Sequence, residues 1–102
     1  MVDPKIVKFE VDTRTTGPFK RANVKWEAYH EDGALNEVKS ELPVPGDDGE
    51  VLEVLDTETT SVSGESASGE YNLRTRGDAD AVRFTVTDIK GQKTIEIKDV
   101  DW

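Results

Sequence analysis

The chain has 102 residues, with 22 acidic and 13 basic side chains, a formal net charge of −9, one histidine and no cysteine. This length accommodates one domain, residues 1–102, and leaves no room for a second core. The absence of cysteine excludes disulfides, thiolate metal sites and thiol catalysis. The acidic charge argues against nucleic acid as a partner. Since no long apolar run is present, we expect no membrane insertion.

The acidic charge is concentrated in one part of the chain. Residues 31–70 contain twelve acidic side chains and one basic side chain, Lys39. Two interpretations stay open: a solvated acidic surface, serving solubility or adaptation to high salt, and a cation-binding edge. Apolar residues make up only 34% of the chain, which predicts a thin core. Two packed sheets suit such a core, because every second residue of a strand faces water.

Apolar and polar residues alternate along most of the chain, which predicts half-buried β-strands. The alternation is strongest at residues 5–12, 22–30, 81–88 and 94–100, and weaker strands are expected at residues 36–42, 51–60 and 70–75. The apolar residues on one face of the strong strands form the predicted core: Val7, Phe9, Val11, Val24, Trp26, Val82, Phe84, Val86, Ile95 and Ile97. We expect Trp26 to be the anchor of this core.

Residues 34–42 also fit a helix, since Leu35, Val38 and Leu42 recur at helical spacing. We interpret this segment as a strand, because Gly33 and Pro43 enclose only nine residues and the neighbouring segments are strands.

Turn residues separate the predicted strands at short intervals, at residues 15–18, 31–33, 43–49, 63–69, 76–78 and 89–91. Gly33, Gly49 and Gly91 stand where a hairpin needs a positive φ. The Ser- and Gly-rich residues 63–69 are interpreted as a loop at one end of the molecule. Seven strands at this spacing predict an all-β antiparallel sandwich.

Four segments in this order resemble a known family: VKWEAYHEDG, DDGEVLEVLDTETT, SGESASGEYNL and VRFTVTDIKGQ. They are similar to the immunoglobulin-like domains of bacterial and archaeal surface proteins, of the PKD-like or fibronectin-III-like kind. The best match is FTVTDIKGQ, residues 84–92, which in that family forms the penultimate strand and a hairpin turn. Gln92 stands where the family commonly has Asn, and the WDFGDG signature of the PKD domain proper is missing. The acidic composition resembles that of proteins from salt-loving archaea.

The resemblance implies an immunoglobulin-like antiparallel β-sandwich of about seven strands. It implies a structural or interaction module, used as a spacer or adhesion domain in exported or cell-surface proteins. The implied partners are another protein or neighbouring domains of the same chain. We expect the isolated domain to be monomeric and to need no cofactor. The first residues show no signal-peptide pattern.

The sequence contains no arrangement of residues typical of an enzyme. Hydrolytic and transfer chemistry needs a nucleophile with a base, or paired acids in a pocket. The single histidine, His30, follows a predicted strand, and we expect it to be a rim residue hydrogen-bonded to the Glu-Asp-Gly turn. A lone histidine cannot form a typical zinc site, and no glycine-rich phosphate loop is present. We therefore predict no catalytic and no cofactor-binding residues.

Ligand binding through loops at one end of the sandwich, with calcium or carbohydrate as the ligand, is the alternative function. Calcium takes oxygen ligands from loops. Asp47, Asp48 and Glu50 share one predicted turn, and Glu31 and Asp32 share another. Solvated turn carboxylates are the simpler interpretation of both groups, so we predict no metal site.

Three further features have a structural interpretation beside a functional one. A carbohydrate platform would need exposed aromatic residues, for which Tyr29, Tyr71 and Phe19 are the candidates outside the predicted core. Residues 76–78 spell an Arg-Gly-Asp adhesion tripeptide, but a tight turn would also need this glycine. Trp102, the final residue, is a candidate for a junction with a following domain.

Overall fold

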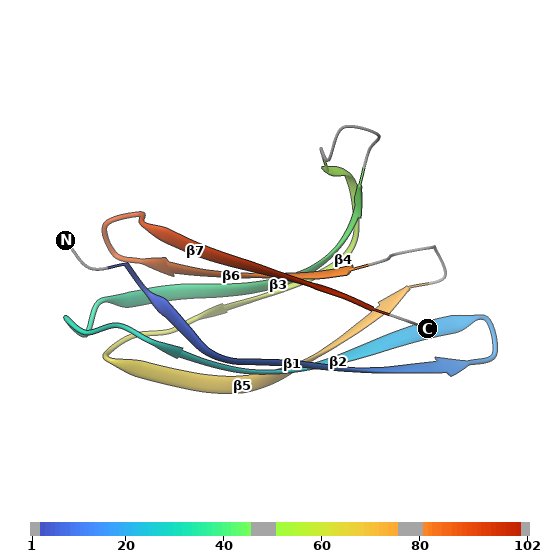
Figure 1. Cartoon of the computed structure of the whole chain (residues 1–102), viewed down its shortest axis with the longest axis horizontal. Helices are drawn as coiled ribbons and strands as arrows, with labels where there is room; N and C mark the ends of the chain where they lie inside the picture. Colours follow the sequence, from blue (N-terminus) through green and yellow to red (C-terminus); the bar gives the residue numbers. More distant parts are fainter. Residues whose placement is uncertain (1–2, 46–50, 76–80, 101–102) are drawn as a thin grey trace.

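A computed structural model describes residues 3–45, 51–75 and 81–100 of the chain. Within them, seven antiparallel strands form two packed sheets: β1 (Lys5–Thr16), β2 (Phe19–Tyr29), β3 (Leu35–Pro45), β4 (Val51–Ser61), β5 (Ser66–Thr75), β6 (Ala81–Asp88) and β7 (Lys93–Asp99). One sheet has the order β1-β2-β5 and the other the order β4-β3-β6-β7 (Figure 1). The predicted all-β sandwich of seven antiparallel strands is therefore confirmed.

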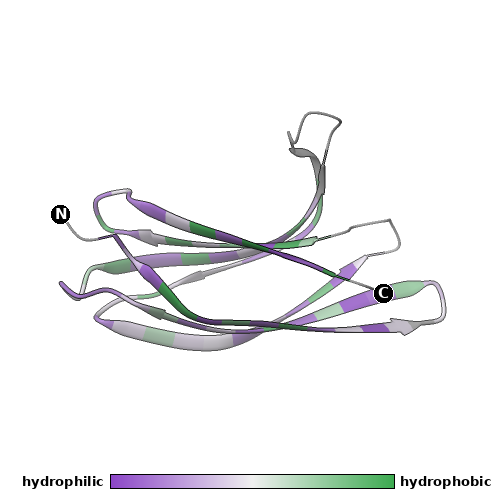
Figure 2. Ribbon diagram, viewed as in Figure 1, coloured by the Kyte–Doolittle hydropathy of each residue, from purple (hydrophilic) through white to green (hydrophobic). Residues whose placement is uncertain are grey.

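The alternation of residue types places the strands correctly in most of the chain. Hydrophobic and hydrophilic residues alternate along the strands (Figure 2). Residues 34–42 lie in a strand and its preceding bridge, as interpreted, and not in a helix. Gly33 and Gly91 have φ angles of 69° and 85°, as predicted for these turns. Gly49 lies outside the described residues.

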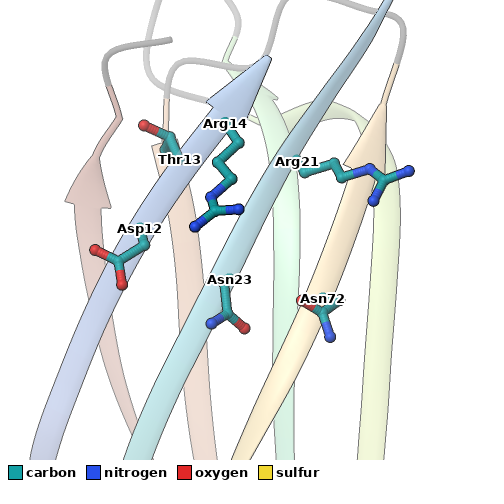
Figure 3. Close-up of a pocket in the computed structure, with 6 residues that line it drawn as sticks. All are labelled: Asp12, Thr13, Arg14, Arg21, Asn23 and Asn72. Carbon is teal, nitrogen blue, oxygen red and sulfur yellow. The ribbon is translucent and has the colours of Figure 1, made fainter. Parts of the chain in front are cut away.

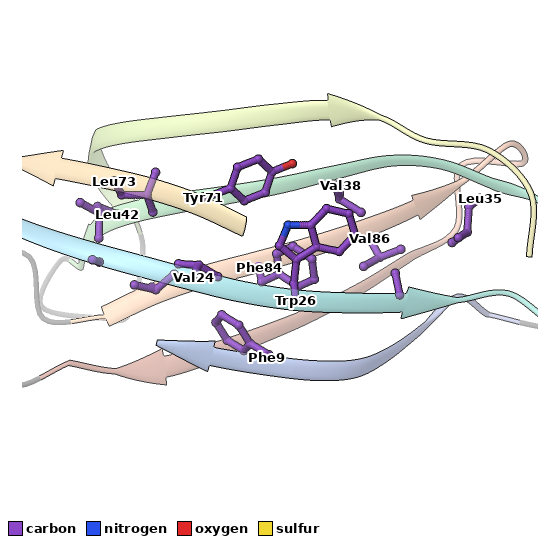
Figure 4. Close-up of a cluster of buried hydrophobic side chains, with 13 residues drawn as sticks. Phe9, Val24, Trp26, Leu35, Val38, Leu42, Tyr71, Leu73, Phe84 and Val86 are labelled. Atoms are coloured by element: carbon purple, nitrogen blue, oxygen red, sulfur yellow. The ribbon is translucent and has the colours of Figure 1, made fainter. Parts of the chain in front are cut away.

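Aromatic rings from both sheets meet at the centre of the core (Figure 4). Phe84 of β6 lies 5.5 Å from Phe9 of β1 and 5.6 Å from Trp26 of β2, measured between ring centroids. Tyr71 of β5 stacks on Trp26 at 5.9 Å. Each large buried side chain contributes about 1.5–3 kcal/mol by leaving water. Trp26 is thus the core anchor that the sequence predicts.

The prediction that Val7 belongs to the core is wrong, because its side chain is 61% exposed. The pairing of β1 with β2 shifts register between Ile6 and Lys8. An irregularity of this kind inserts a residue and reverses the face of the side chains before it. Phe9, after the shift, remains buried, and Ile6, before it, packs partly against the core.

The prediction that Ile95 and Ile97 belong to the core is also wrong, since their side chains are 55% and 60% exposed. Ile95 pairs with Thr85, and Ile97 pairs with Arg83. Directly opposite residues share a face, and Thr85 and Arg83 alternate with Val82, Phe84 and Val86, the core residues of β6. Both isoleucines therefore lie on the outer face of the four-stranded sheet.

The inner face of β7 is polar and connects this strand to β1 of the other sheet. Lys98 Nζ donates to the backbone carbonyl of Phe9 at 3.0 Å and lies 5.8 Å from the centroid of the Phe9 ring. Thr94 Oγ1 donates to the backbone carbonyl of Pro4. These bonds link the two sheets at an edge of the sandwich.

The Ser- and Gly-rich segment 63–69, predicted as a loop, is only partly one, because β5 begins at Ser66. Gly69 pairs with Trp26 across the sheet. A Cβ atom on Gly69 would lie 2.8 Å from Cζ2 of Trp26, closer than side-chain contacts allow. The absence of a side chain at Gly69 thus reflects the packing of the indole ring and not a loop.

The predicted turn at residues 43–49 is shorter at its start, since β3 continues to Pro45. The pairing of β3 with β6 ends at Glu41, whereas its pairing with β4 continues to Pro45 with register shifts. Proline cannot donate to a ladder and is tolerated at irregular or edge positions. Pro43 and Pro45 therefore lie where β3 has lost one of its two neighbours.

The first and last strands place the two described chain ends at opposite ends of the sandwich. Lys5, at the start of β1, pairs with Tyr29, whereas Asp99, at the end of β7, pairs with Ala81 at the other end (Figure 1). The longest dimension of the molecule is 44 Å. No helix of the described residues has the length and apolar character needed to cross a membrane.

Candidate binding surfaces

Three turns meet at the end of the sandwich where β1 begins. They connect β2 to β3, β4 to β5 and β6 to β7. The backbone N–H of His30 donates to the carbonyl of Glu65 at 2.7 Å, and that of Leu35 donates to Gly64 at 3.1 Å. The N–H of Ile89 donates to the carbonyl of Ala34 at 2.9 Å. Backbone groups of this end are thus used to hold the turns together.

His30 lies inside this end and uses both ring nitrogens. The backbone N–H of Asp32 donates to Nδ1 of His30 at 3.1 Å, so Nδ1 is the acceptor nitrogen. Nε2 therefore carries the proton and donates to Oδ2 of Asp88 at 3.2 Å. The side chains of His30 and Asp88 are only 3% and 1% exposed. The expected bond from the turn to His30 is confirmed, but the expected rim position is wrong.

Asp88 connects His30 to the turn between β6 and β7. Its Oδ1 accepts the backbone N–H groups of Lys90 and Gln92, both at 2.9 Å. Burial raises the pKa of Asp88, but the bonds from Gln92, His30 and Lys90 outweigh it and leave the pKa below its ordinary value. The carboxylate is therefore charged at neutral pH, and hydrogen-bond donors surround it, which is the condition for burying a charge. This pair is a structural element of the loop end.

The calcium candidates Asp47, Asp48 and Glu50 lie outside the described residues, as do residues 76–78 and Trp102. Glu31 and Asp32 are exposed in the turn after β2. Among the described residues, no group of three or more His, Asp or Glu side chains is arranged to hold a metal ion.

The three aromatic candidates for a carbohydrate platform lie in different environments. Tyr71 is 8% exposed and belongs to the core, so its assignment outside the core is wrong. Its hydroxyl donates to Oγ1 of Thr60 at 2.6 Å, and burial raises its pKa. Tyr29 and Phe19 are partly exposed. The negative charge of Glu65 is the main cause of the raised pKa of Tyr29.

A shallow hollow of about 600 Å³ lies on the outer face of the β1-β2-β5 sheet (Figure 3). Its lining residues are Asp12, Thr13, Arg14, Arg21, Asn23 and Asn72. The strand register explains their proximity, because Asp12 is opposite Asn23 and Asn23 is opposite Asn72. These three residues form a row that crosses the whole sheet. We call it the amide row, after its two asparagines, and it includes the Asp12 carboxylate.

A second row, two residues further along each strand, consists of arginines. Arg14 is opposite Arg21, and Arg21 is opposite Arg74. All three side chains are exposed. Figure 3 shows Arg14 between β1 and β2, near Asn23, and Arg21 extending towards β5. We call Arg14, Arg21 and Arg74 the arginine row; the sequence alone did not reveal it.

Comparison with known proteins identifies no family for the chain. No family model matches it, and no curated protein matches it. Its function is therefore inferred from the residues and geometry of the chain itself.

Proposed function

We propose that the chain is a non-catalytic spacer module of an exported or cell-surface protein, of the fibronectin-III-like kind. The sequence resemblance supports this, and so does the strand order. In a constant-type immunoglobulin domain the fourth strand joins the sheet of the first two. Here β4 pairs with β3 in the other sheet, as in fibronectin-III-like sandwiches.

The position of the described chain ends is the observation that carries the proposal. β1 starts at one end of the long axis and β7 finishes at the other, on a molecule 44 Å long. Domains connected through such ends extend in a line, with each copy adding its own length. A spacer needs this geometry, since ends at the same pole would fold successive domains back on each other.

The loop end offers less support for the alternative, binding of calcium or carbohydrate through loops. Backbone groups of all three described turns bond to one another. His30, the only histidine, has both ring nitrogens engaged. No observation on the described residues favours a ligand at this end, so the spacer is the function proposed.

A tandem array tests the proposal. Three copies joined by short linkers are measured by small-angle X-ray scattering and compared with one and two copies. A spacer should increase the maximum dimension by about 44 Å for each added copy. The matched control joins the copies through long Gly-Ser linkers, which behave as flexible coils and give a broad distance distribution. A short-linked array that is as broad as this control, or that grows by much less than one domain length, would contradict the proposal.

A further inference from the structure

The arginine row places three positive charges side by side on a chain with a net charge of −9. Like charges directly opposite each other destabilise a pair of strands. Within the described residues, none of the three guanidinium groups forms an ion pair or a side-chain hydrogen bond. Arg74 does form a hydrogen bond through its backbone, because its backbone N–H donates to Oδ2 of Asp56 at 2.8 Å. The unused guanidinium donors and the repulsion among the three positive charges both favour an anion at this row.

The adjacent amide row has a different chemistry. The amide row is separated from the arginine row by two residues along each strand, a distance of about 7 Å. Amide groups both donate and accept hydrogen bonds, as hydroxyl groups do, whereas the Asp12 carboxylate only accepts. Oδ1 of Asn23 is buried beneath this row and accepts no hydrogen bond within the part of the chain described. This row therefore suits hydroxyl groups, and Asp12 would repel a second anion.

We propose that the outer face of β1, β2 and β5 binds a short anionic saccharide. The arginine row holds its sulfate or carboxylate group, because a guanidinium binds oxyanions through two parallel hydrogen bonds. The amide row holds hydroxyl groups of the same or the next sugar. This site lies on a sheet face and is separate from the loops at the end of the sandwich.

A third row limits the length and kind of the ligand. This row lies two residues beyond the amide row, where Lys25 of β2 is opposite both Glu10 of β1 and Glu70 of β5. Two of these three side chains are carboxylates, so a polyanion continuing along the strands would meet like charge. The site thus favours a single anionic group followed by neutral hydroxyl-bearing units over a nucleic-acid strand.

Titration by NMR tests the proposal with four probes: a disaccharide with one sulfate group, a disaccharide with one uronate carboxylate, a neutral disaccharide and a short oligothymidylate. The sulfated or the carboxylated disaccharide should shift the amide signals of residues in the arginine and amide rows, and the one that binds more tightly identifies the anion. The triple variant Arg14→Gln, Arg21→Gln, Arg74→Gln should weaken that binding by about tenfold or more, since each exposed charge pair contributes modestly.

The matched control removes the same charge elsewhere. Lys5, Lys90 and Lys93 are exposed, and none belongs to the three rows. Their triple replacement by Gln gives the same net charge and should leave the affinity within about twofold of wild type, because exposed charges a Debye length or more away are largely screened. The bound disaccharide should also raise the thermal midpoint of wild type and of this control, but not that of the arginine variant.

Three results would overturn the proposal. Equal loss of affinity in both triple variants would mean that the ligand responds only to the overall charge. Oligothymidylate binding as tightly as the best disaccharide would mean that the face recognises polyanions in general. Absence of any shift in the two rows with either charged disaccharide would mean that the face binds no anionic saccharide. A merely structural role of the arginines would not produce ligand-dependent stabilisation that disappears in the arginine variant alone.

Discussion

At the scale of single residues, Asp88 is the side chain on which the loop end depends. Its carboxylate accepts from His30 and from the N–H groups of Lys90 and Gln92. In Asp88→Asn, the amide can accept at only one atom, so either His30 or the turn loses a partner. We expect the melting temperature at pH 7 to fall by about 5 °C or more, measured by circular dichroism.

The same variant should show a defined pH dependence. The pKa of Asp88 is lowered in the folded chain, so its stabilising contribution is present above the unfolded-state pKa and is lost as the pH falls through the folded one. The difference in melting temperature between wild type and Asp88→Asn should therefore begin to shrink below about pH 4 and continue to shrink as the pH falls further. Asp99 is exposed, and Asp99→Asn is the control that should leave stability at pH 7 unchanged. A variant at Asp88 as stable as wild type at pH 7 would refute this account.

At the scale of elements, the start of β5 is fixed by the indole ring of Trp26. A Cβ atom on Gly69 would lie 2.8 Å from Cζ2, 3.1 Å from Cε2 and 3.2 Å from Nε1 of this ring. Because Trp26 is only 3% exposed, it has little room to move. We expect Gly69→Ala to lower the free energy of unfolding by about 1–3 kcal/mol, measured by chemical denaturation.

A double-mutant cycle separates this clash from a change in strand propensity. Trp26→Phe leaves a smaller ring, so adding Gly69→Ala to it should cost less than in wild type, and the two effects should be non-additive. Ser68→Ala, at an exposed neighbouring position of β5, should change the free energy of unfolding by less than about 0.5 kcal/mol. Additive effects at residues 26 and 69 would show that the ring does not restrict Gly69.

The elements also show where alternation stops being informative. It predicts two faces for each strand, and for β2 and β6 the large apolar face is the buried one. In β7 the isoleucines face outward, because the inner positions of this edge strand bind the backbone of the other sheet through Lys98 and Thr94. A pattern of period two cannot distinguish these outcomes. Only the register against β6 and the position beside β1 decide between them.

At the scale of the whole molecule, the predictability of the candidate binding face depends on sequence separation. The pairing of Arg14 with Arg21 follows from a hairpin centred on Gly17 and Pro18, so this part could have been deduced from the predicted turn. Arg74 joins the row only through the pairing of β2 with β5. That pairing brings together residues far apart in the chain, and no local pattern specifies it.

The fold also brings acidic residues of the segment 31–70 near one another. Glu65 and, less strongly, Glu31 raise the pKa of the same side chain, Tyr29, so both charges lie at the loop end of the sandwich. Glu37 and Glu58 lie on the paired strands β3 and β4. The repulsion within the acidic segment is thus a property of the tertiary structure as well as of the composition.

This repulsion predicts a rise in stability with sodium chloride. Added salt shortens the Debye length from about 30 Å at 0.01 M to about 10 Å at 0.1 M and about 3 Å at 1 M, so most of the screening is complete below 1 M. We expect the urea denaturation midpoint to rise over this range and then to level off, and Glu31→Gln combined with Glu58→Gln and Glu65→Gln should reduce the rise. Chloride is the appropriate anion, because sulfate would also occupy the arginine row and stabilise folded proteins in general. A marked further gain above 1 M would indicate adaptation to high salt, whereas a midpoint independent of salt would show that the acidic segment is not under repulsion.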